Sequence, residues 1–263
     1  MNDTSPACEY STITERPGDG AHREQLSALI TRYHFAAAQC GGKDVLEVCC
    51  GAGIGLGYLA REARSVVGGD IDPLNLSYAR KYFRDRKNIQ VTELDALDTP
   101  FSAGSFDVVV CFEAIYYFQS LNEFLAEVSR ILRPGGRLIG CSVNCEWHGF
   151  NPSPYSKQYY SYVQLLKELL QAGFETEFFL GFEDNPRTFK RRLVTWLRFL
   201  AVSLHLIPKT MKGKEWLKRL FYGDLVSLPN EITAATASLQ PLVEVKPGIQ
   251  VCNYKVVYFI AKK

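Results

Sequence analysis

Val45–Gly55 reads VLEVCCGAGIG and sets the topology of the chain around it. The stretch begins as an apolar strand that only Glu47 interrupts, and it ends in a turn with glycine at Gly51, Gly53 and Gly55. Glycine lets the backbone turn tightly and approach a ligand closely, because it carries no side chain. The stretch therefore predicts a strand that passes through a ligand-holding turn into a helix.

Apolar, β-branched runs alternate with helical patterns along the chain. They predict strands at 44–48, 65–70, 89–93, 106–111, 136–143, 175–182 and 250–261, and helices at 22–38, 54–63, 74–85, 120–132 and 160–172. Such alternation is typical of an α/β fold, here a Rossmann-like parallel sheet with helices on both faces. LRPGG at Leu132–Gly136 is expected to end one helix and to turn into the next strand.

A long stretch separates the last two predicted strands. Residues 184–249 are too long for a plain loop and have a helical pattern, which predicts a helical cap inserted into the core. The cofactor-binding core would then comprise 22–183 and the last strand 250–263, with 1–21 as a flexible N-terminal segment or lid. Cations crowd 187–219 against the single acid Glu215, so this part either covers the site or makes a peripheral contact with an anionic membrane.

The charge, the N-terminus and the cysteine content disfavour several classes of function. A net charge of +2 and a pI near 8.1 do not favour nucleic acid as a partner. The N-terminus carries Asp3, Glu9 and Glu15 without an apolar run, which indicates neither a signal peptide nor an anchor and predicts a cytoplasmic protein. The eight cysteines lack paired CxxC spacing, so we predict reduced thiols and no metal site. The sequence predicts no oligomeric state.

Two acidic residues follow the next two predicted strands. Asp70, in VVGGDIDP, ends the second strand, where its carboxylate can accept hydrogen bonds from both ribose hydroxyls while Ile71 lies on the adenine face. Asp95, in LDALDTPF, follows the third strand and can accept from the adenine amine or cap the turn. The ends of the first three predicted strands would thus contact one nucleoside.

The ligand predicted for the glycine turn is cationic. A GxGxxG dinucleotide loop needs glycine where Leu56 stands in one register and where Tyr58 stands in the other, so the fingerprint fails twice. The acidic Glu47 would also repel a pyrophosphate, whereas it attracts a ligand with a sulfonium and an ammonium group. A nicotinamide-dependent oxidoreductase, which would share the fold, is therefore disfavoured.

In this order the motifs resemble those of the class I S-adenosylmethionine-dependent methyltransferases, especially the small-molecule group. That family carries VLEVGCGxG, GxDxxP, a GDA-like turn, FDVVVxxEVLEH and LRPGG, and the similarity spans about residues 43–143. It implies a seven-stranded sheet of order 3-2-1-4-5-7-6 and S-adenosyl-L-methionine as the cofactor. The positions that would line the cofactor site are Glu47, Cys49, Gly51, Gly53, Asp70, Ile71, Asp95, Ala96 and Phe112.

The chain departs from the family pattern in two motifs. Cys49 replaces the first glycine of the loop, which predicts a slightly reshaped pocket. Tyr116 and Tyr117 replace the Glu-His pair of many relatives, so no catalytic role of that histidine carries over. The candidate bases are Tyr117 and His148, with aromatic packing and a plain surface loop as the alternatives, while Tyr116 and Trp147 are expected to shape the acceptor pocket.

Methyl transfer is an in-line displacement, so the protein must mainly align the reactants and exclude water, and a base is optional. We expect transfer to an O or N atom of a small organic acceptor, a sugar or a natural-product intermediate in a biosynthetic pathway. One alternative is a lipid or prenylated quinone at a membrane surface. A second alternative is a catalytically silent scaffold that binds the cofactor without turnover.

Overall fold

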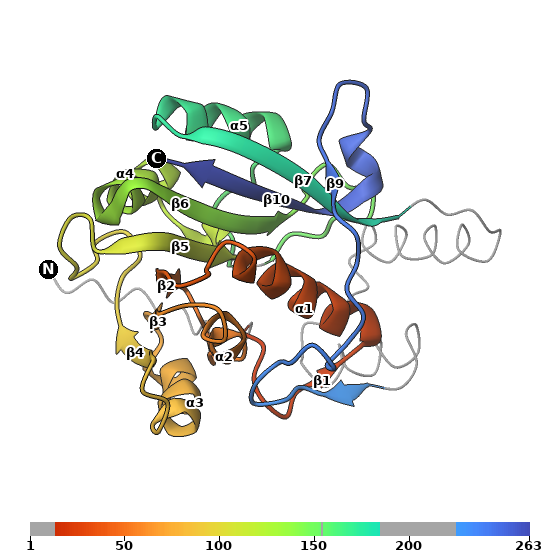
Figure 1. Ribbon diagram of the computed structural model, residues 1–263. Coiled ribbons are helices and arrows are strands. Elements are labelled where there is room, and N and C mark those ends of the chain that lie inside the picture. The colour runs from red at the N-terminus through yellow and green to blue at the C-terminus, as the bar shows by residue number, and fades with distance from the viewer. Residues whose placement is uncertain (1–13, 154, 185–224) are drawn as a thin grey trace, which may run out of the picture.

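A mostly parallel sheet carries helices on both faces (Figure 1). The computed structural model describes residues 14–153, 155–184 and 225–263. The main strands are β2 (Asp44–Val48), β3 (Ser65–Asp70), β4 (Ile89–Glu93), β5 (Phe106–Phe112), β6 (Leu132–Val143), β7 (Glu175–Glu183) and β10 (Tyr254–Lys262). With β9 (Val243–Glu244) at one edge, they lie in the order β4-β3-β2-β5-β6-β10-β7-β9. The seven predicted strands follow the implied order, and β9 extends it.

The helices divide between the two faces of the sheet. The first group is α1 (Arg23–Ala37), α2 (Leu56–Leu59) and α3 (Pro73–Phe83), and the second is α4 (Leu121–Ile131) and α5 (Tyr162–Gln171). Leu29 and Leu76 belong to the apolar cluster under the first group, while Phe124 and Leu169 belong to the cluster under the second. Because both faces are covered, the central strands are nearly continuous runs of apolar residues.

Three elements differ from their predictions by four residues at one end. The strand predicted at 250–261 is β10, which begins only at Tyr254 because Val251–Asn253 forms a 3-10 turn before it. The helix predicted at 54–63 is only the four-residue α2. After it, the Glu62 carbonyl accepts from the Gly42 N–H and the Arg64 N–H donates to the Lys43 carbonyl, because the chain there already turns into β3. LRPGG does end α4, as predicted, but β6 already begins at Leu132. Its pairing with β5 shifts register after Leu132 and resumes at Arg137, so the proline and glycines form an irregularity within the strand.

The described part of the predicted insertion is not helical. Residues 225–249 contain turns and two short strands, β8 (Val226–Ser227) and β9. β8 pairs with β1 (Gly20–Ala21) and β9 with β7, so both hold the chain extended. The basic stretch 187–219 lies outside the described residues, and the cap there stays a prediction. Among the helices that are described, none is long and apolar enough to cross a membrane.

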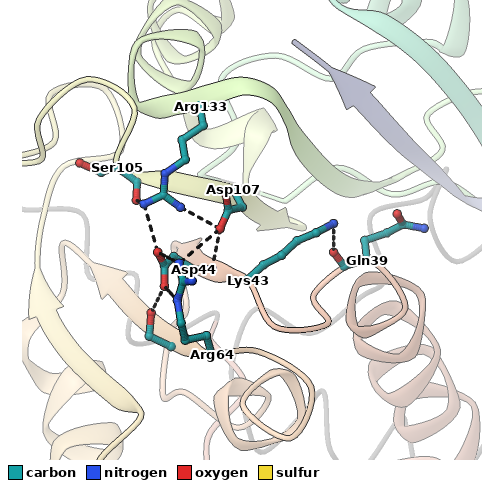
Figure 2. A network of polar contacts seen from close by, with 8 residues as sticks. Gln39, Lys43, Asp44, Arg64, Ser105, Asp107 and Arg133 are labelled. Carbon is teal, nitrogen blue, oxygen red and sulfur yellow. Dashed lines mark hydrogen bonds and ion pairs between the residues drawn. The ribbon is translucent and has the colours of Figure 1, made fainter.

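Ion pairs join the amino ends of the central strands (Figure 2). Asp44, at the start of β2, pairs with Arg64 and with Arg133, whose guanidinium lies 3.0 Å from it. Asp107 in β5 accepts from Arg133 at 2.8 Å and from the backbone N–H of Asp44 at 2.9 Å. These arginines hold the pKa of both carboxyl groups below its usual range against the opposing effect of burial. The network thus ties β2, β5 and β6 together at one end of the sheet.

Candidate functional site

A cavity of about 680 Å³ opens at the opposite end of the sheet, where β2, β3 and β5 have their carboxyl ends. Its volume is in the range of small-molecule sites, and this end is where open α/β sheets hold their ligands. Of the residues predicted for the site, the lining includes Glu47, Cys49, Gly51, Asp70, Ile71, Asp95, Ala96, Phe112, Tyr116 and Tyr117. The strand order therefore brings together most of the predicted set.

Asp70 holds the glycine turn in place. One carboxylate oxygen accepts the backbone N–H of Gly51 at 2.8 Å, and the other accepts that of Asp72 at 2.9 Å. Burial raises the pKa of this carboxyl group, although the two backbone donors oppose the shift. Each oxygen keeps lone-pair capacity toward the cavity, which is what two ribose hydroxyls require.

The turn itself adopts a left-handed backbone at three positions. Cys49 has φ 55°, Gly51 has φ 56° and Gly53 has φ 74°. A Cβ atom on Gly51 would lie 2.7 Å from the Thr14 side chain, which covers the turn. Gly53 is not in the cavity lining; a Cβ there would lie 2.7 Å from that of Ala79 in α3. Its predicted ligand contact is thus replaced by close packing between the turn and α3.

Glu47 presents an unpartnered buried oxygen. Its Oε1 atom accepts from the Tyr33 hydroxyl at 2.6 Å, while Oε2 has no hydrogen-bond partner among the described residues. Burial raises the pKa of this carboxyl group to about 7, against the Tyr33 hydrogen bond and the nearby Arg32. Because buried polar atoms are normally satisfied, Oε2 indicates a missing donor, and a ligand cation fits it.

Arg32 supplies the opposite charge in the same cavity. It forms an ion pair with Glu15 at 3.0 Å, but its buried Nε atom has no partner among the described residues. A buried donor on Arg32 and a buried acceptor on Glu47 match the carboxylate and the ammonium of an α-amino acid. The sequence did not reveal Arg32 or Tyr33, because only the packing of α1 brings them to the turn.

The next part of the cavity has the features of a nucleoside site. Ile71 and Ala96 line it, and Asp95 accepts the backbone N–H of Leu97 at 2.9 Å. Asp95 therefore caps its turn and also lines the cavity, where the predicted hydrogen bond from an adenine amine stays a prediction. Phe112 is buried at the end of β5, and its ring meets the edge of Tyr33 at 5.2 Å between centroids.

Glu113 is the main residue that the sequence analysis missed. It lines the cavity at the end of β5 with φ 51°, and its Oε2 atom accepts from the Val143 N–H at 3.0 Å and from the Tyr116 hydroxyl at 3.2 Å. Among the described residues, Oε1 has only the Cys141 thiol as a donor, at 3.8 Å. Burial raises the pKa of this carboxyl group. Its position as an acidic residue directly after a buried strand was the available signal.

Aromatic side chains surround Glu113. The Tyr116 ring stacks on Tyr159 at 4.6 Å between centroids, and the Tyr117 hydroxyl donates to the Ser153 hydroxyl at 3.3 Å. Phe118 also lines this part of the cavity. Burial raises the pKa of Tyr117, so its phenol is a poor base at neutral pH. Tyr116 and Tyr117 are therefore better suited to shape an acceptor pocket than to accept a proton.

His148 and Trp147 lie away from this cavity. Trp147 is buried in the loop after β6, where its indole N–H donates to Asp184 at 2.9 Å and the ammonium group of Lys255 lies 5.5 Å from its ring centroid. His148 is exposed, and neither residue lines the cavity. The geometry thus offers no support for a base at His148 or for an acceptor contact at Trp147, because this loop packs against the start of β10 and the residue after β7.

The described part of the N-terminal segment covers the turn. Thr14 and Glu15 line the cavity, and Thr14 accepts from the Asn75 amide at 3.1 Å. Glu15 is held by Arg32. This part of the predicted lid therefore lies over the site.

Comparison with known proteins finds methyltransferases among the relatives of this chain. A family model described as a methyltransferase domain matches residues 46–140. A phthiotriol/phenolphthiotriol dimycocerosates methyltransferase 1 of Mycobacterium ulcerans is 33% identical over 208 residues, 73% of this chain and 72% of that protein. A fatty-acid O-methyltransferase of Mycolicibacterium smegmatis is 41% identical over 117 residues, 42% of this chain and 41% of that protein. The chain spans 44–58% of the length of other mycobacterial relatives.

A solved structure shares the fold. Phosphoethanolamine N-methyltransferase 2 of Haemonchus contortus, in complex with S-adenosyl-L-methionine, superposes with a TM-score of 0.53 at 18% identity. The superposition covers 94% of this chain and 53% of that chain.

Proposed function

Because the chain belongs to the class I S-adenosylmethionine-dependent methyltransferases, we propose that it methylates a hydroxyl oxygen of a lipid. One observation carries the proposal. A single cavity holds charged groups that match the two ends of the cofactor and, beside them, the buried carboxylate of Glu113 within an aromatic surround. The first set would hold the donor, and the second would receive the acceptor.

The donor end is assigned to residues of matching chemistry. Glu47 Oε2 would bind the ammonium group of the cofactor, Arg32 Nε its carboxylate, and Asp70 its ribose hydroxyls. When bound, the cofactor supplies an electrophilic methyl group on a sulfonium. Thr14 covers the glycine turn from the N-terminal side and helps to exclude water.

At the acceptor end, Glu113 would take the hydroxyl proton at Oε1 as the acceptor oxygen bonds to the methyl carbon. The methyl–sulfur bond of the sulfonium would break in the same displacement, and S-adenosylhomocysteine would be the leaving group. Its Oε2 atom is already held by Val143 and Tyr116, whereas the described part of the chain gives Oε1 only a weak thiol donor. Burial raises the pKa of this carboxyl group and so strengthens it as a base. A general base of this kind is worth about 10²–10⁴-fold in rate.

A lipid acceptor is proposed on two grounds. Relatives with 33% and 41% identity are named for dimycocerosate and fatty-acid methylation. The lining beside Glu113 also includes the rings of Tyr116, Tyr117 and Phe118, which offer apolar contact area to an acyl chain.

The test supplies the purified chain with methyl-tritiated S-adenosylmethionine and separate long-chain acceptors: a fatty alcohol, a 1,3-diol and a fatty acid. We expect label in the solvent-extracted alcohol or diol, identified as a methyl ether by mass spectrometry, and none with Asp70→Ala. Label confined to the fatty acid or to added sugars would contradict the hydroxyl-lipid assignment. Cofactor binding without label in any acceptor would support the silent scaffold instead.

A further inference from the structure

The outer face of α3 exposes a row of large apolar side chains. Leu74 is 49% exposed, Tyr78 37% and Tyr82 45%. These residues are four apart, so they lie above one another on one side of the helix. The opposite side of α3 is buried against the sheet by Leu76, Ala79 and Phe83. In Figure 1, α3 lies at the edge of the molecule beside β4.

Positive charge accompanies this row. Residues 73–87 contain five cations and the single acid Asp85, which gives this short segment a net charge of +4 against +2 for the whole chain. The cations are Arg80, Lys81, Arg84, Arg86 and Lys87, and all are exposed. Arg84 pairs with Asp85 and Arg86 with Glu231, whereas the other three form no ion pair within the described residues. Their charge is therefore available to a partner.

Another described helix shows the contrast. On α5, Val163 is 64% exposed and Leu170 is 55% exposed, but the charged residues between them, Lys167 and Glu168, cancel. Exposed apolar groups alone are common on protein surfaces. On α3 they coincide with an excess of cations, and two of the three are tyrosines, which suit the boundary between water and acyl chains.

We propose that this face of α3, formed by Leu74, Tyr78 and Tyr82 with Lys81 beside them and with the cations of 84–87 after the helix end, docks on an anionic lipid surface. The row begins three residues after Ile71, which lines the cavity, so docking would bring the cavity mouth close to that surface. Apolar and aromatic side chains enter the headgroup region, and the cations pair with lipid phosphates. The contact goes beyond the proposed methyl transfer, because it needs neither cofactor nor acceptor.

The experiment sediments the full chain with vesicles of phosphatidylglycerol mixed with phosphatidylcholine and, separately, with vesicles of phosphatidylcholine alone. The wild type is expected to sediment with the anionic vesicles and to be released by salt, because the attraction is screened. The variant Leu74→Ser/Tyr78→Ser/Tyr82→Ser should lose at least about ten-fold in vesicle affinity, and Lys81→Gln/Lys87→Gln should weaken the preference for anionic vesicles.

The matched control is Val163→Ser/Leu170→Ser, which removes similarly exposed apolar groups from α5 and should sediment like the wild type. Unchanged binding of S-adenosylhomocysteine by every variant shows that the fold and the cofactor site are intact. A wild type that stays in the supernatant, or α3 variants that sediment as well as the wild type, would overturn the proposal. So would a wild-type dimer that the apolar α3 variant converts to monomer, since a second copy would then cover this face.

Discussion

At the scale of single residues, Glu47 is in an environment that disfavours its charge until a cation arrives. Its carboxylate is buried, one oxygen is satisfied by Tyr33, and the other is not satisfied by any described residue. The sequence predicted a charge suited to a cation at this position. It could not predict Arg32 as the complement, because that pairing depends on how α1 packs across the turn.

The ionisation of Glu47 should make stability depend on pH. Its folded pKa of about 7 lies above the reference value of 4.5, so the folded state keeps this proton longer than the unfolded state. The contribution is fully present below pH 4.5 and is lost as the pH rises toward 7. Glu47→Gln, which cannot ionise, should raise the unfolding free energy at pH 8 by about 1–3 kcal/mol while weakening S-adenosylhomocysteine binding at least about ten-fold.

Urea unfolding of both proteins from pH 4.5 to 8, with calorimetric titration of the ligand, checks this prediction. Equal pH dependence of wild type and Glu47→Gln would show that the carboxylate is not penalised by burial. Undiminished ligand binding would show that its free oxygen does not face the ammonium group.

Glu113 is the second residue with a testable role. Glu113→Gln keeps the size and the Tyr116 contact but cannot accept a proton, so kcat with a hydroxyl acceptor should fall about 10²–10⁴-fold. S-adenosylhomocysteine affinity should stay within about three-fold, because the residue belongs to the acceptor end. Single-turnover kinetics measures the first quantity and calorimetry the second. An unchanged methyl-transfer rate would remove Glu113 from the mechanism.

At the level of the elements, the sequence predicted the position of the glycine turn and its role as a ligand-holding turn. The backbone conformation then explains why the turn has these residues. Cys49 stands where the family has glycine, and its φ of 55° is the conformation that glycine adopts most easily. Gly53 was expected to touch the ligand, yet its missing side chain makes room for Ala79 of α3. Sequence motifs located the turn, whereas its contacts with α3 and Thr14 needed the tertiary structure.

Substitutions at Cys49 and Gly51 should therefore differ in their effect on ligand affinity. Cys49→Gly removes the strain of a side chain in a left-handed backbone, about 1 kcal/mol, but glycine also gives the unfolded chain a similar gain in conformational entropy. The free energy of unfolding should therefore change by less than about 1 kcal/mol, and ligand affinity by less than about three-fold. Gly51→Val should weaken binding at least about ten-fold, because its side chain would strain the turn and meet Thr14. Titration with S-adenosylhomocysteine compares them. Equal binding by both variants would contradict the close approach at Gly51.

The ion-pair network at the other end of the sheet should affect stability alone. Asp44→Asn removes the charge shared by Arg64 and Arg133 and should cost about 1–2 kcal/mol at pH 7. The folded pKa of Asp44 is lowered, so its contribution is present above the reference value of 3.8 and is lost as the pH falls below it. The difference between variant and wild type in urea unfolding should shrink accordingly. A difference that persists in acid would indicate a packing effect.

At the scale of the whole molecule, the alternating pattern predicted the sheet because each central strand is buried on both faces. The motifs could place Glu47, Asp70 and Asp95 together, because the carboxyl ends of the parallel strands β2, β3 and β4 meet at one edge of the sheet. The pattern failed at 225–249, where β8 and β9 are held extended by pairing with distant strands. It also failed at Trp147, whose contacts with Asp184 and Lys255 come from far along the chain.

Isothermal titration of S-adenosylmethionine into the wild type, Asp70→Ala and Asp44→Asn tests most directly whether the glycine turn binds the cofactor. We expect micromolar binding by the wild type and by Asp44→Asn, whose substitution lies at the far end of the sheet. Asp70→Ala should lose at least about ten-fold in affinity, because its carboxylate holds the turn and faces the ribose. Absence of binding by the wild type, or equal binding by Asp70→Ala, would contradict the account.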